Sequence, residues 1–326
     1  MRNLFSKSRH AIIITDHVLR YAEVRNQSLD HINTAAERYI PEGVMVHGQI
    51  KEVDTLLSLL QDCVEEWGLK GKEVMFTLPD TQVLVRRHTI PMDVEEDHIL
   101  GHLYMQLGET LHLPIEQPVF DWYEIERDEE KRDVLLFAAP EPTVTTIARL
   151  MREVKMKPRA ADLSALSLYR FYDTWLGEET PSHVMQMQVF PDAFHVSIFH
   201  DGLPLIVRTM NLQTSMEDWE VNPHDDDPIQ WNGPPEKVFS SWKDAVGELN
   251  KLLHFYQFNY QHGEAAVSRI RISGDHPYLE RIIEDLRASV DLPVDYLYES
   301  EWKTSQGHGL ETKYYPAVGL ALKNEV

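Results

Sequence analysis

The sequence has a single cysteine, Cys63, among its 326 residues. One cysteine can form neither an internal disulfide bond nor a zinc site built from several thiolates, which favours a reduced, cytoplasmic setting. Cys63 lies among apolar residues in a helical pattern, so we expect it in the core and not as a nucleophile. No apolar run approaches the ~20 residues of a membrane span. The basic start is not followed by the apolar segment that a signal peptide requires. We therefore expect a soluble protein that reaches a membrane only through a partner.

Positive charge is also scarce. The chain has 31 Lys and Arg residues against 53 Asp and Glu residues, a formal net charge of −22. Such a surface repels nucleic acids and anionic lipids, so we expect neither as a direct partner, whereas a basic peptide is attracted. The acidic run His224–Asp227 lies in a proline-rich stretch, which indicates a solvated loop and not a cation site.

Motifs for metal binding or catalysis are missing as well. His98 and His102 have a spacing that can hold a metal on a helix, but no HExxH pattern or third ligand accompanies them. We interpret both as surface histidines and expect no metal. The sequence has no G-x-S-x-G elbow and no Walker loop, and we assign no catalytic residue.

The apolar patterns predict alternating strands and helices. Residues 11–25 read as a β-hairpin, 32–41 as a third strand, 53–67 as an amphipathic helix and 72–79 as a buried strand. This order opens the actin-like and ribonuclease H-like folds, among other α/β folds. A similar series of three strands follows at 183–210, with a tight turn at Asp201-Gly202. The weak internal repeat predicts two lobes of similar design.

Residues 83–162 have a different pattern of predicted elements, in the order βαββαβ. We expect this block to be an inserted subdomain. The first lobe is then formed by residues 1–82 and 163–180, with a C-terminal helix at about 312–326 returning to it. Residues 181–311 form the second lobe.

A series of motifs extends along nearly the whole chain, in the order YAEVR, GVMVHGQI, VMFTLPDTQVLVRRHTIP, LLFAAPEPTVTTIARLM, IRISGDHPYLERIIEDL and YYPAVGLAL. No single motif is specific, but the ordered series resembles the PilM family of type IV pilus assembly proteins, relatives of the actin-like division protein FtsA. The resemblance implies an α/β, actin-like (ribonuclease H-like) fold of two lobes with an inserted βαββαβ subdomain. It also implies ATP between the lobes.

At the nucleotide loops the sequence departs from the family. The first phosphate loop of the family has an acid, a glycine, hydroxyl residues and a lysine. The corresponding positions here hold Ile13, Thr15, Asp16, His17, Val18 and Arg20, with no glycine. Glycine lets backbone N–H groups close around phosphate oxygens, and Asp16 brings negative charge toward them. Arg20 alone keeps the positive charge, unless it faces solvent.

The second loop has Gln188 and Phe190 where the family has an acid and a glycine. The third element, near adenosine in the family, keeps Ser273, Gly274 and Asp275. We therefore expect a degenerate nucleotide cleft, no bound cofactor and no enzymatic activity, so that the chain is a pseudo-ATPase. The first alternative is an active actin-like ATPase whose nucleotide state regulates assembly. A small-molecule kinase would need a carboxylate base and an intact phosphate clamp, and neither is found.

The family implies a cytoplasmic scaffold at the inner face of the cell membrane, in a type IV pilus or a related secretion or competence machine. It would bind the cytoplasmic N-terminal tail of a PilN-like single-pass membrane protein, and other pilus platform proteins. We place the tail in a groove near the inserted subdomain, whose strands carry Arg86, Arg87, Phe120, Trp122 and Tyr123. Strand edges with aromatic residues suit peptide capture. The other interpretation is that these aromatic side chains are covered by a helix.

Overall fold

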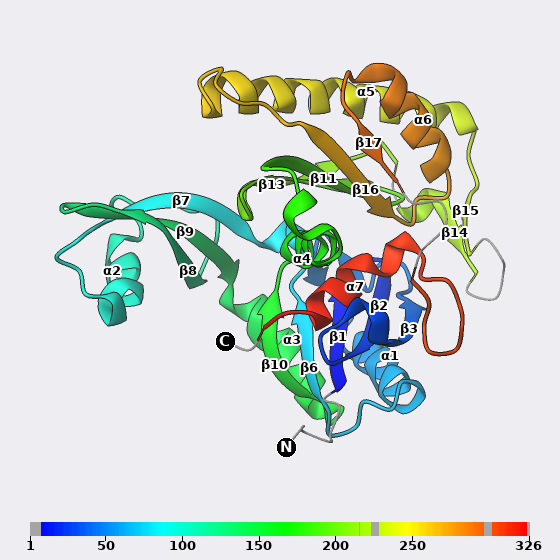
Figure 1. Ribbon diagram of the computed structural model, residues 1–326. Coiled ribbons are helices and arrows are strands. Elements are labelled where there is room, and N and C mark those ends of the chain that lie inside the picture. The colour runs from blue at the N-terminus through cyan, green and yellow to red at the C-terminus, as the bar shows by residue number, and fades with distance from the viewer. Residues whose placement is uncertain (1–7, 215, 223–227, 297–301, 325–326) are drawn as a thin grey trace.

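The computed structural model describes residues 8–214, 216–222, 228–296 and 302–324. The run His224–Asp227 lies outside these residues. The chain forms two lobes with a separate sheet projecting from one side (Figure 1). Within the described residues, no helix has both the length and the apolar character that a membrane crossing requires.

The first lobe is built on a five-stranded sheet in the order β10-β6-β1-β2-β3. Its strands are β1 (Ser8–Ile14), β2 (Val18–Arg25), β3 (Ile32–Tyr39), β6 (Glu73–Thr77) and β10 (Lys157–Asp162). The first three form an antiparallel meander, whereas β6 pairs in parallel with both β1 and β10. Both faces of β1 are apolar because helices cover both faces of the sheet.

Residues of β1 alternate between the two cores of this lobe. Ile12 and Ile14 pack with helices α1 (Val53–Glu66) and α3 (Glu141–Glu153). Ala11 and Ile13 pack with α4 (Ser164–Leu176) and α7 (Tyr315–Ala321) on the other face. Cys63 lies on the inner face of α1 and is fully buried, as predicted. The C-terminal helix α7 packs in the first lobe and is shorter than the expected 312–326.

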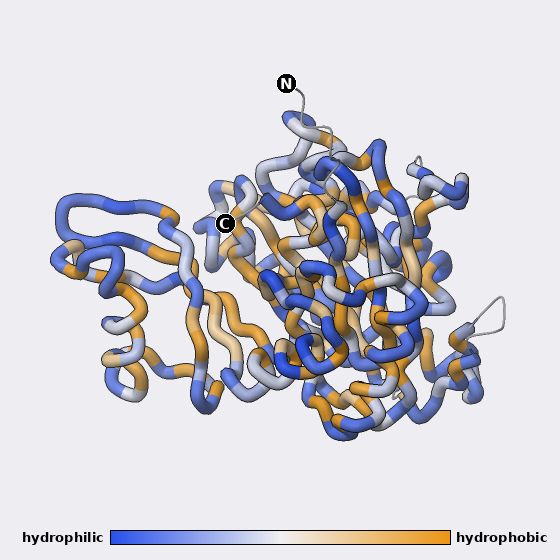
Figure 2. The backbone as a smooth tube through the Cα atoms, turned by 90° about the horizontal axis from the view of Figure 1, so that it is seen from below, coloured by the Kyte–Doolittle hydropathy of each residue, from blue (hydrophilic) through white to orange (hydrophobic). Residues whose placement is uncertain are grey.

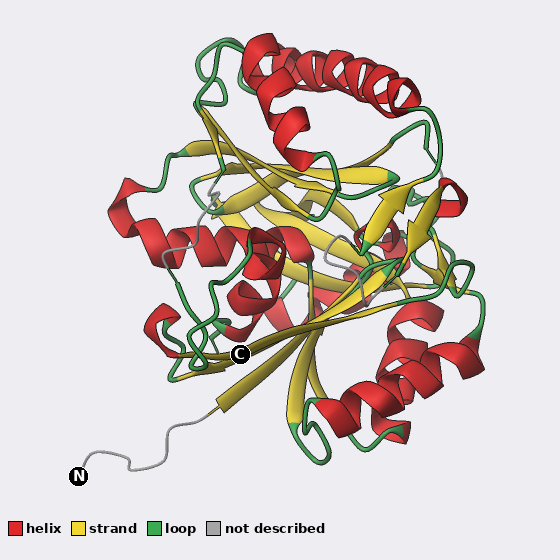
Figure 3. Cartoon of the chain, turned by 90° about the vertical axis from the view of Figure 1, so that its right-hand side faces the viewer, coloured by secondary structure: helices red, strands yellow, loops and turns green. Residues whose placement is uncertain are grey.

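The second lobe repeats this design, which confirms the internal repeat. Its sheet has the order β13-β12-β11-β16-β17. The strands are β11 (His183–Val189), β12 (Ala193–His200), β13 (Leu203–Asn211), β16 (Arg269–Gly274) and β17 (Val294–Asp295). Helices α5 (Pro235–His254) and α6 (Leu279–Ser289) cover its outer face (Figure 3). Helix α4 lies between the lobes, because its Ala165 packs on Val184 and Phe199 of this second sheet.

Shorter elements complete the chain. They are the strands β4 (Met45–Val46), β5 (Gln49–Ile50), β14 (Trp219–Val221) and β15 (Ile229–Trp231), the π turn Phe255–Tyr260, and the 3-10 turns Leu29–His31, Asp80–Gln82, Glu96–His98, Gly177–Glu179, Met216–Asp218 and Thr312–Tyr314. Apolar segments gather inside the lobes, whereas polar segments cover the outside (Figure 2).

The predicted block 83–162 contains the expected order of elements: β7 (Leu84–Pro91), α2 (Ile99–Gln106), β8 (Pro118–Arg127), β9 (Lys131–Pro140), α3 and β10. Only the first four project as a separate unit, with the sheet order β7-β9-β8. We call this unit, residues 84–140, the arm. The prediction of one inserted module over 83–162 therefore requires correction, since β10 pairs with β6 and α3 packs in the first lobe. Parallel strands need a crossover connection, and α3 supplies it between β6 and β10.

The contact between α7 and α4 depends on Gly319. A Cβ atom at this position would lie 1.9 Å from the carbonyl oxygen of Ser167 and 3.1 Å from the Cβ of Phe171. We expect Gly319→Ala to lower the free energy of unfolding by about 2 kcal/mol or more, because the packed helices must separate. Urea unfolding followed by circular dichroism measures this loss.

Gly247 provides the matched control, because it lies inside α5 and a Cβ atom added there would have no atom within 4 Å. Gly247→Ala should stabilise the protein by about 0.5–1 kcal/mol through the lower backbone entropy of alanine. Equal unfolding midpoints for the two variants would contradict the packing argument.

Candidate functional site

The nucleotide loops predicted from the sequence meet between the lobes. The first loop follows β1 and the second follows β11, and both lie at the carboxyl ends of these strands. Thr15, Asp16 and His17 of the first loop and Phe190 of the second line one shared cavity. Its volume is about 40 Å³, far below the ~300–1,000 Å³ of ordinary ligand pockets.

The first loop is closed by hydrogen bonds within the protein. The Thr15 N–H donates to the carbonyl oxygen of Val18 at 3.1 Å, and the Val18 N–H donates to Thr15 Oγ1 at 3.2 Å. Asp16 Oδ1 accepts from the Gly48 N–H at 2.8 Å. Phosphate loops rely on free backbone N–H groups. The N–H groups of Thr15 and Val18 already have protein acceptors.

Arg20 is buried on β2 and forms an ion pair with Asp275, which follows β16 in the other lobe. The interpretation that Arg20 faces solvent is therefore wrong. His17 Nε2 donates to the same carboxylate, at 2.7 Å from Asp275 Oδ2. Arg20 Nε also donates to Glu37 Oε2 at 3.0 Å. We call Asp275, Arg20 and His17 the interlobe clamp.

The clamp keeps its carboxylate ionised. Burial by itself would raise the pKa of Asp275, but the charges of Arg20 and His17 and their hydrogen bonds outweigh it and hold that pKa far below its usual range. Burial lowers the pKa of the neighbouring His276 to about 4, although Asp275 opposes this. His276 is therefore neutral at pH 7, and its Nδ1 accepts from the Tyr278 N–H at 3.0 Å.

The second loop is filled by the ring of Phe190, which is buried between the lobes. Its edge meets the rings of His17 and His195, with ring centroids 5.5 and 4.9 Å apart. Gln188 lies on the adjoining strand, also buried, and its Nε2 donates to Ser164 Oγ at 2.8 Å. The phenylalanine ring thus occupies space that a glycine would leave open.

A second polar contact between the lobes was not predicted from the sequence. Asp80 follows β6 in the first lobe, and its Oδ2 lies 2.9 Å from Nδ1 of His195 on β12. Ser164, at the start of α4, donates to the same carboxylate through its Oγ. Asp80 comes directly after a strand that is parallel to β1. That position at a strand end is the signal that could have placed it in the cleft.

The retained glycine of the third element has a packing role. Gly274 has a φ of +134°, and a Cβ there would lie 2.1 Å from the carbonyl oxygen of Val189. The N–H groups of Asp275 and His276 donate to that same oxygen, at 3.1 and 3.2 Å. Ser273 on the same strand is buried. Close packing of β16 on β11 thus requires the glycine without any nucleotide.

The residues predicted to bind a partner are divided between the two faces of the arm sheet. Strand β9 lies between β7 and β8 and pairs with both. The tight hairpin between β8 and β9 makes β8 the neighbour of β9 on one side, and β7 pairs on the other side. Arg86 and Trp122 both lie opposite Leu136, and Phe120 shares their face of the sheet, under α2. Arg87 and Tyr123 both lie opposite Leu135, on the other face.

The environments of these side chains differ accordingly. Phe120 and Trp122 pack against the buried core under α2, which supports the interpretation that a helix covers them. Arg86 Nη1 donates to the carbonyl oxygen of His112 at 3.2 Å, and Arg87 Nε donates to Asp133 Oδ2 at 3.2 Å. Tyr123 is exposed.

The two histidines with metal-ligand spacing, His98 and His102, also lie in different environments. His98 is exposed and lies 3.8 Å from carboxylate oxygens of both Glu95 and Asp97. His102 is partly covered and does not belong to this group. Both were expected to be surface histidines, and of the two only His98 is exposed.

A larger groove lies at the root of the arm, where it joins the first lobe. Its volume is about 730 Å³, and its walls are mainly apolar. Ile50 and Val53 line it from the first lobe, whereas Leu84 and Ile115 line it from the arm. Glu116 is the one charged residue in its lining. The apolar pair Pro114-Ile115, in a loop before β8, is the sequence signal that could have indicated it.

Two lobes with matching sheet orders and a cleft between the strand ends define an actin-like protein. The family model of the type IV pilus assembly protein PilM matches residues 13–212. The chain therefore belongs to this family, as predicted. A comparison with curated proteins gave no match.

Solved structures agree with this fold. A PilM–PilN type IV pilus biogenesis complex contains a chain with a TM-score of 0.74 and 14% identity, covering 98% of both chains. The ethanolamine utilization protein EutJ of Carboxydothermus hydrogenoformans has a TM-score of 0.57 and 6% identity, over 98% of this chain and 90% of that one. The cytoplasmic domain of EpsL, from the Vibrio cholerae type II secretion system, has a TM-score of 0.53 and 9% identity, over 98% of this chain and 97% of that one. At these identities the likeness concerns the fold.

The interlobe clamp can be tested by removing its negative charge. We expect Asp275→Asn to lower the free energy of unfolding by about 3 kcal/mol, because Arg20 and His17 stay buried without their shared carboxylate. The surface pair Arg281 and Asp285 on α6, with side chains 62% and 35% exposed, provides the control. Asp285→Asn should cost no more than about 0.5 kcal/mol. Urea unfolding at pH 7 measures both, and similar losses for the two variants would refute the clamp.

Proposed function

We propose that this protein is a cytoplasmic scaffold of a type IV pilus, or a related secretion or competence system. In this role it binds the cytoplasmic N-terminal tail of a PilN-like single-pass membrane protein. Membership of the PilM family and the fold it shares with the PilM chain of a PilM–PilN complex support the proposal. Through that tail the protein would lie at the inner face of the cell membrane. Contacts with other pilus platform proteins remain a prediction.

We place the tail in the groove at the root of the arm. This groove is the observation that carries the proposal, because a short extended peptide needs apolar pockets beside a rigid wall. One wall is α1 with Val53 and the other is the arm with Leu84 and Ile115. The arm is attached at both of its ends, because it joins the first lobe through β6 on one side and α3 on the other. None of the arm residues predicted from the sequence to bind the partner lines this groove.

Charge supports the same partner. The protein has a net charge of −22, and the groove lining has Glu116 but no basic residue. Membrane proteins carry an excess of Lys and Arg in their cytoplasmic flanks. A basic tail is therefore attracted to this face, and the attraction weakens as salt rises.

A labelled peptide that copies the tail of the PilN-like protein of the same organism tests the location. We expect Ile115→Asp to weaken binding by about tenfold or more, because it places an unpaired charge in an apolar groove. Fluorescence anisotropy measures the affinity. Met105→Asp, at an exposed position on α2, is the matched control and should leave the affinity unchanged.

Two further variants separate the groove from the site predicted from the sequence. Trp122→Ala and Arg87→Glu change the two faces of the arm sheet. Loss of binding in these variants, with normal binding by Ile115→Asp, would move the site to the arm and reject the groove.

We propose in addition that the cleft no longer uses ATP. The side chain of Phe190 fills the second loop, and the N–H groups of Thr15 and Val18 in the first loop already have acceptors within that loop. The alternative is an ATPase whose nucleotide state regulates assembly.

Calorimetry with ATP and magnesium tests these two possibilities. We expect no saturable binding in the micromolar range, since the shared cavity has a volume of only about 40 Å³. Low-micromolar affinity, or hydrolysis that Phe190→Trp abolishes, would favour the active ATPase.

A further inference from the structure

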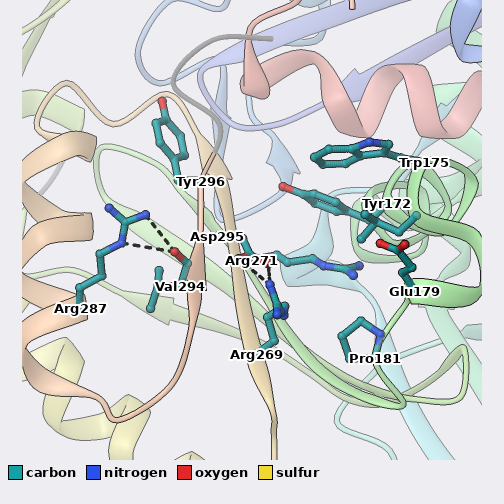
Figure 4. A pocket seen from close by; sticks show the side chains of 11 residues that line it. Tyr172, Trp175, Glu179, Pro181, Arg269, Arg271, Arg287, Val294, Asp295 and Tyr296 are labelled. Carbon is teal, nitrogen blue, oxygen red and sulfur yellow. Dashed lines mark hydrogen bonds and ion pairs between the residues drawn. The ribbon is translucent and has the colours of Figure 1, made fainter. Parts of the chain in front are cut away.

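A second pocket lies between the lobes, away from the cleft (Figure 4). Its volume is about 340 Å³. Tyr172 and Trp175 of α4 form the first-lobe side, and Arg269 and Arg271 of β16 form part of the second-lobe side. It shares no lining residue with the cavity at the nucleotide loops. The two are therefore separate sites.

Arg271 is the unusual residue of this pocket. Its side chain is fully buried, with 0% of its surface exposed. None of its three guanidinium nitrogens has a hydrogen-bond partner among the described residues. Its flat face lies over the ring of Tyr172, with the Cζ atom 4.7 Å from the ring centroid. This cation–π contact stabilises the face of the guanidinium but leaves its in-plane N–H groups unused.

Other charges in the pocket do not neutralise Arg271. Asp295 is engaged by Arg269, whose Nη1 lies 2.9 and 3.0 Å from its two carboxylate oxygens. Arg287 also lines the pocket and donates from Nη2 to the carbonyl oxygen of Val294 at 2.9 Å. The lining thus holds three arginines against the two carboxylates Asp295 and Glu179. A positive recess of this kind stands out in a protein with a net charge of −22.

Burial also acts on the guanidinium itself. It lowers the pKa of Arg271, opposed by Tyr172 and Asp295. A buried charge without hydrogen bonds is costly, and proteins normally pair it or use it to hold a ligand. The guanidinium fork matches the two oxygens of a carboxylate or phosphate group.

We propose that this pocket is an oxyanion site, which binds the phosphate or carboxylate group of a small molecule with Arg271 as its principal ligand. The volume suits a small ligand. The partly exposed ring of Trp175 offers aromatic surface to the rest of that molecule. Because residues of both lobes line the pocket, its occupant contacts both lobes at once.

Titrations with inorganic phosphate and with succinate test the proposal. Sodium chloride at the same ionic strength is the reference, because any salt screens the acidic surface. We expect one saturable site for at least one of the two anions, measured by calorimetry, and a rise in melting temperature beyond the chloride reference. Binding of phosphate alone indicates a phosphorylated ligand, whereas binding of succinate alone indicates a carboxylate.

Variants locate the bound anion. Arg271→Met should weaken binding by about tenfold or more, whereas Arg281→Met, on the surface of α6, should have no effect. Glu179→Gln, at an exposed position of the lining, should strengthen binding by removing a negative charge. This variant decides the question if Arg271→Met does not fold. Absence of saturable binding to both anions, or unchanged affinity in Arg271→Met or Glu179→Gln, would overturn the proposal.

Discussion

One buried carboxylate, that of Asp275, joins the two lobes of this protein. Arg20 and His17 approach it from the first lobe, while its own backbone is held to Val189 in the second. Attraction between opposite charges is strong where water is excluded, and breaking such a pair leaves a buried charge without compensation. In an actin-like fold this is the region where nucleotide phosphates would lie between the lobes. Here protein side chains supply both the positive and the negative charge, so that the lobes are joined without a ligand.

The same region explains why the cavity between the nucleotide loops is small. The ring of Phe190 lies between two histidine rings, and the contact of Asp80 with His195 adds a second polar link across the lobes. The groove at the root of the arm has a different origin. The arm interrupts the crossover between β6 and β10, so both of its ends are attached to the first lobe and the groove walls are held in place.

The elements that sequence reasoning predicted well are those with a local pattern. The hairpin of β1 and β2, the helix around Cys63 and the repeat of three strands in the second lobe all follow from periodicity over a few residues. Features that depend on distant pairing were missed. Arg20 and Asp275 are 255 residues apart, and no local pattern shows that one neutralises the other. The position of β9 between β7 and β8 is likewise decided by strand pairing, so Arg86 and Trp122 share a face without being neighbours. The absence of glycine from the first two loops could be recognised from the sequence, because a phosphate loop is a short, local motif.

Arg20 and Arg271 show two different uses of a buried arginine in one chain. Both side chains are almost completely covered. Arg20 has two carboxylate partners, Asp275 and Glu37, and this full pairing is what a structural role requires. Arg271 has an aromatic ring against its face, but its guanidinium nitrogens have no hydrogen-bond partner in the described part of the chain. A fold that satisfies one buried cation so completely has no physical reason to leave another unsatisfied, unless a further group completes it. The clamp joins the lobes at the strand ends, and an anion at Arg271 would join them at a second position along β16.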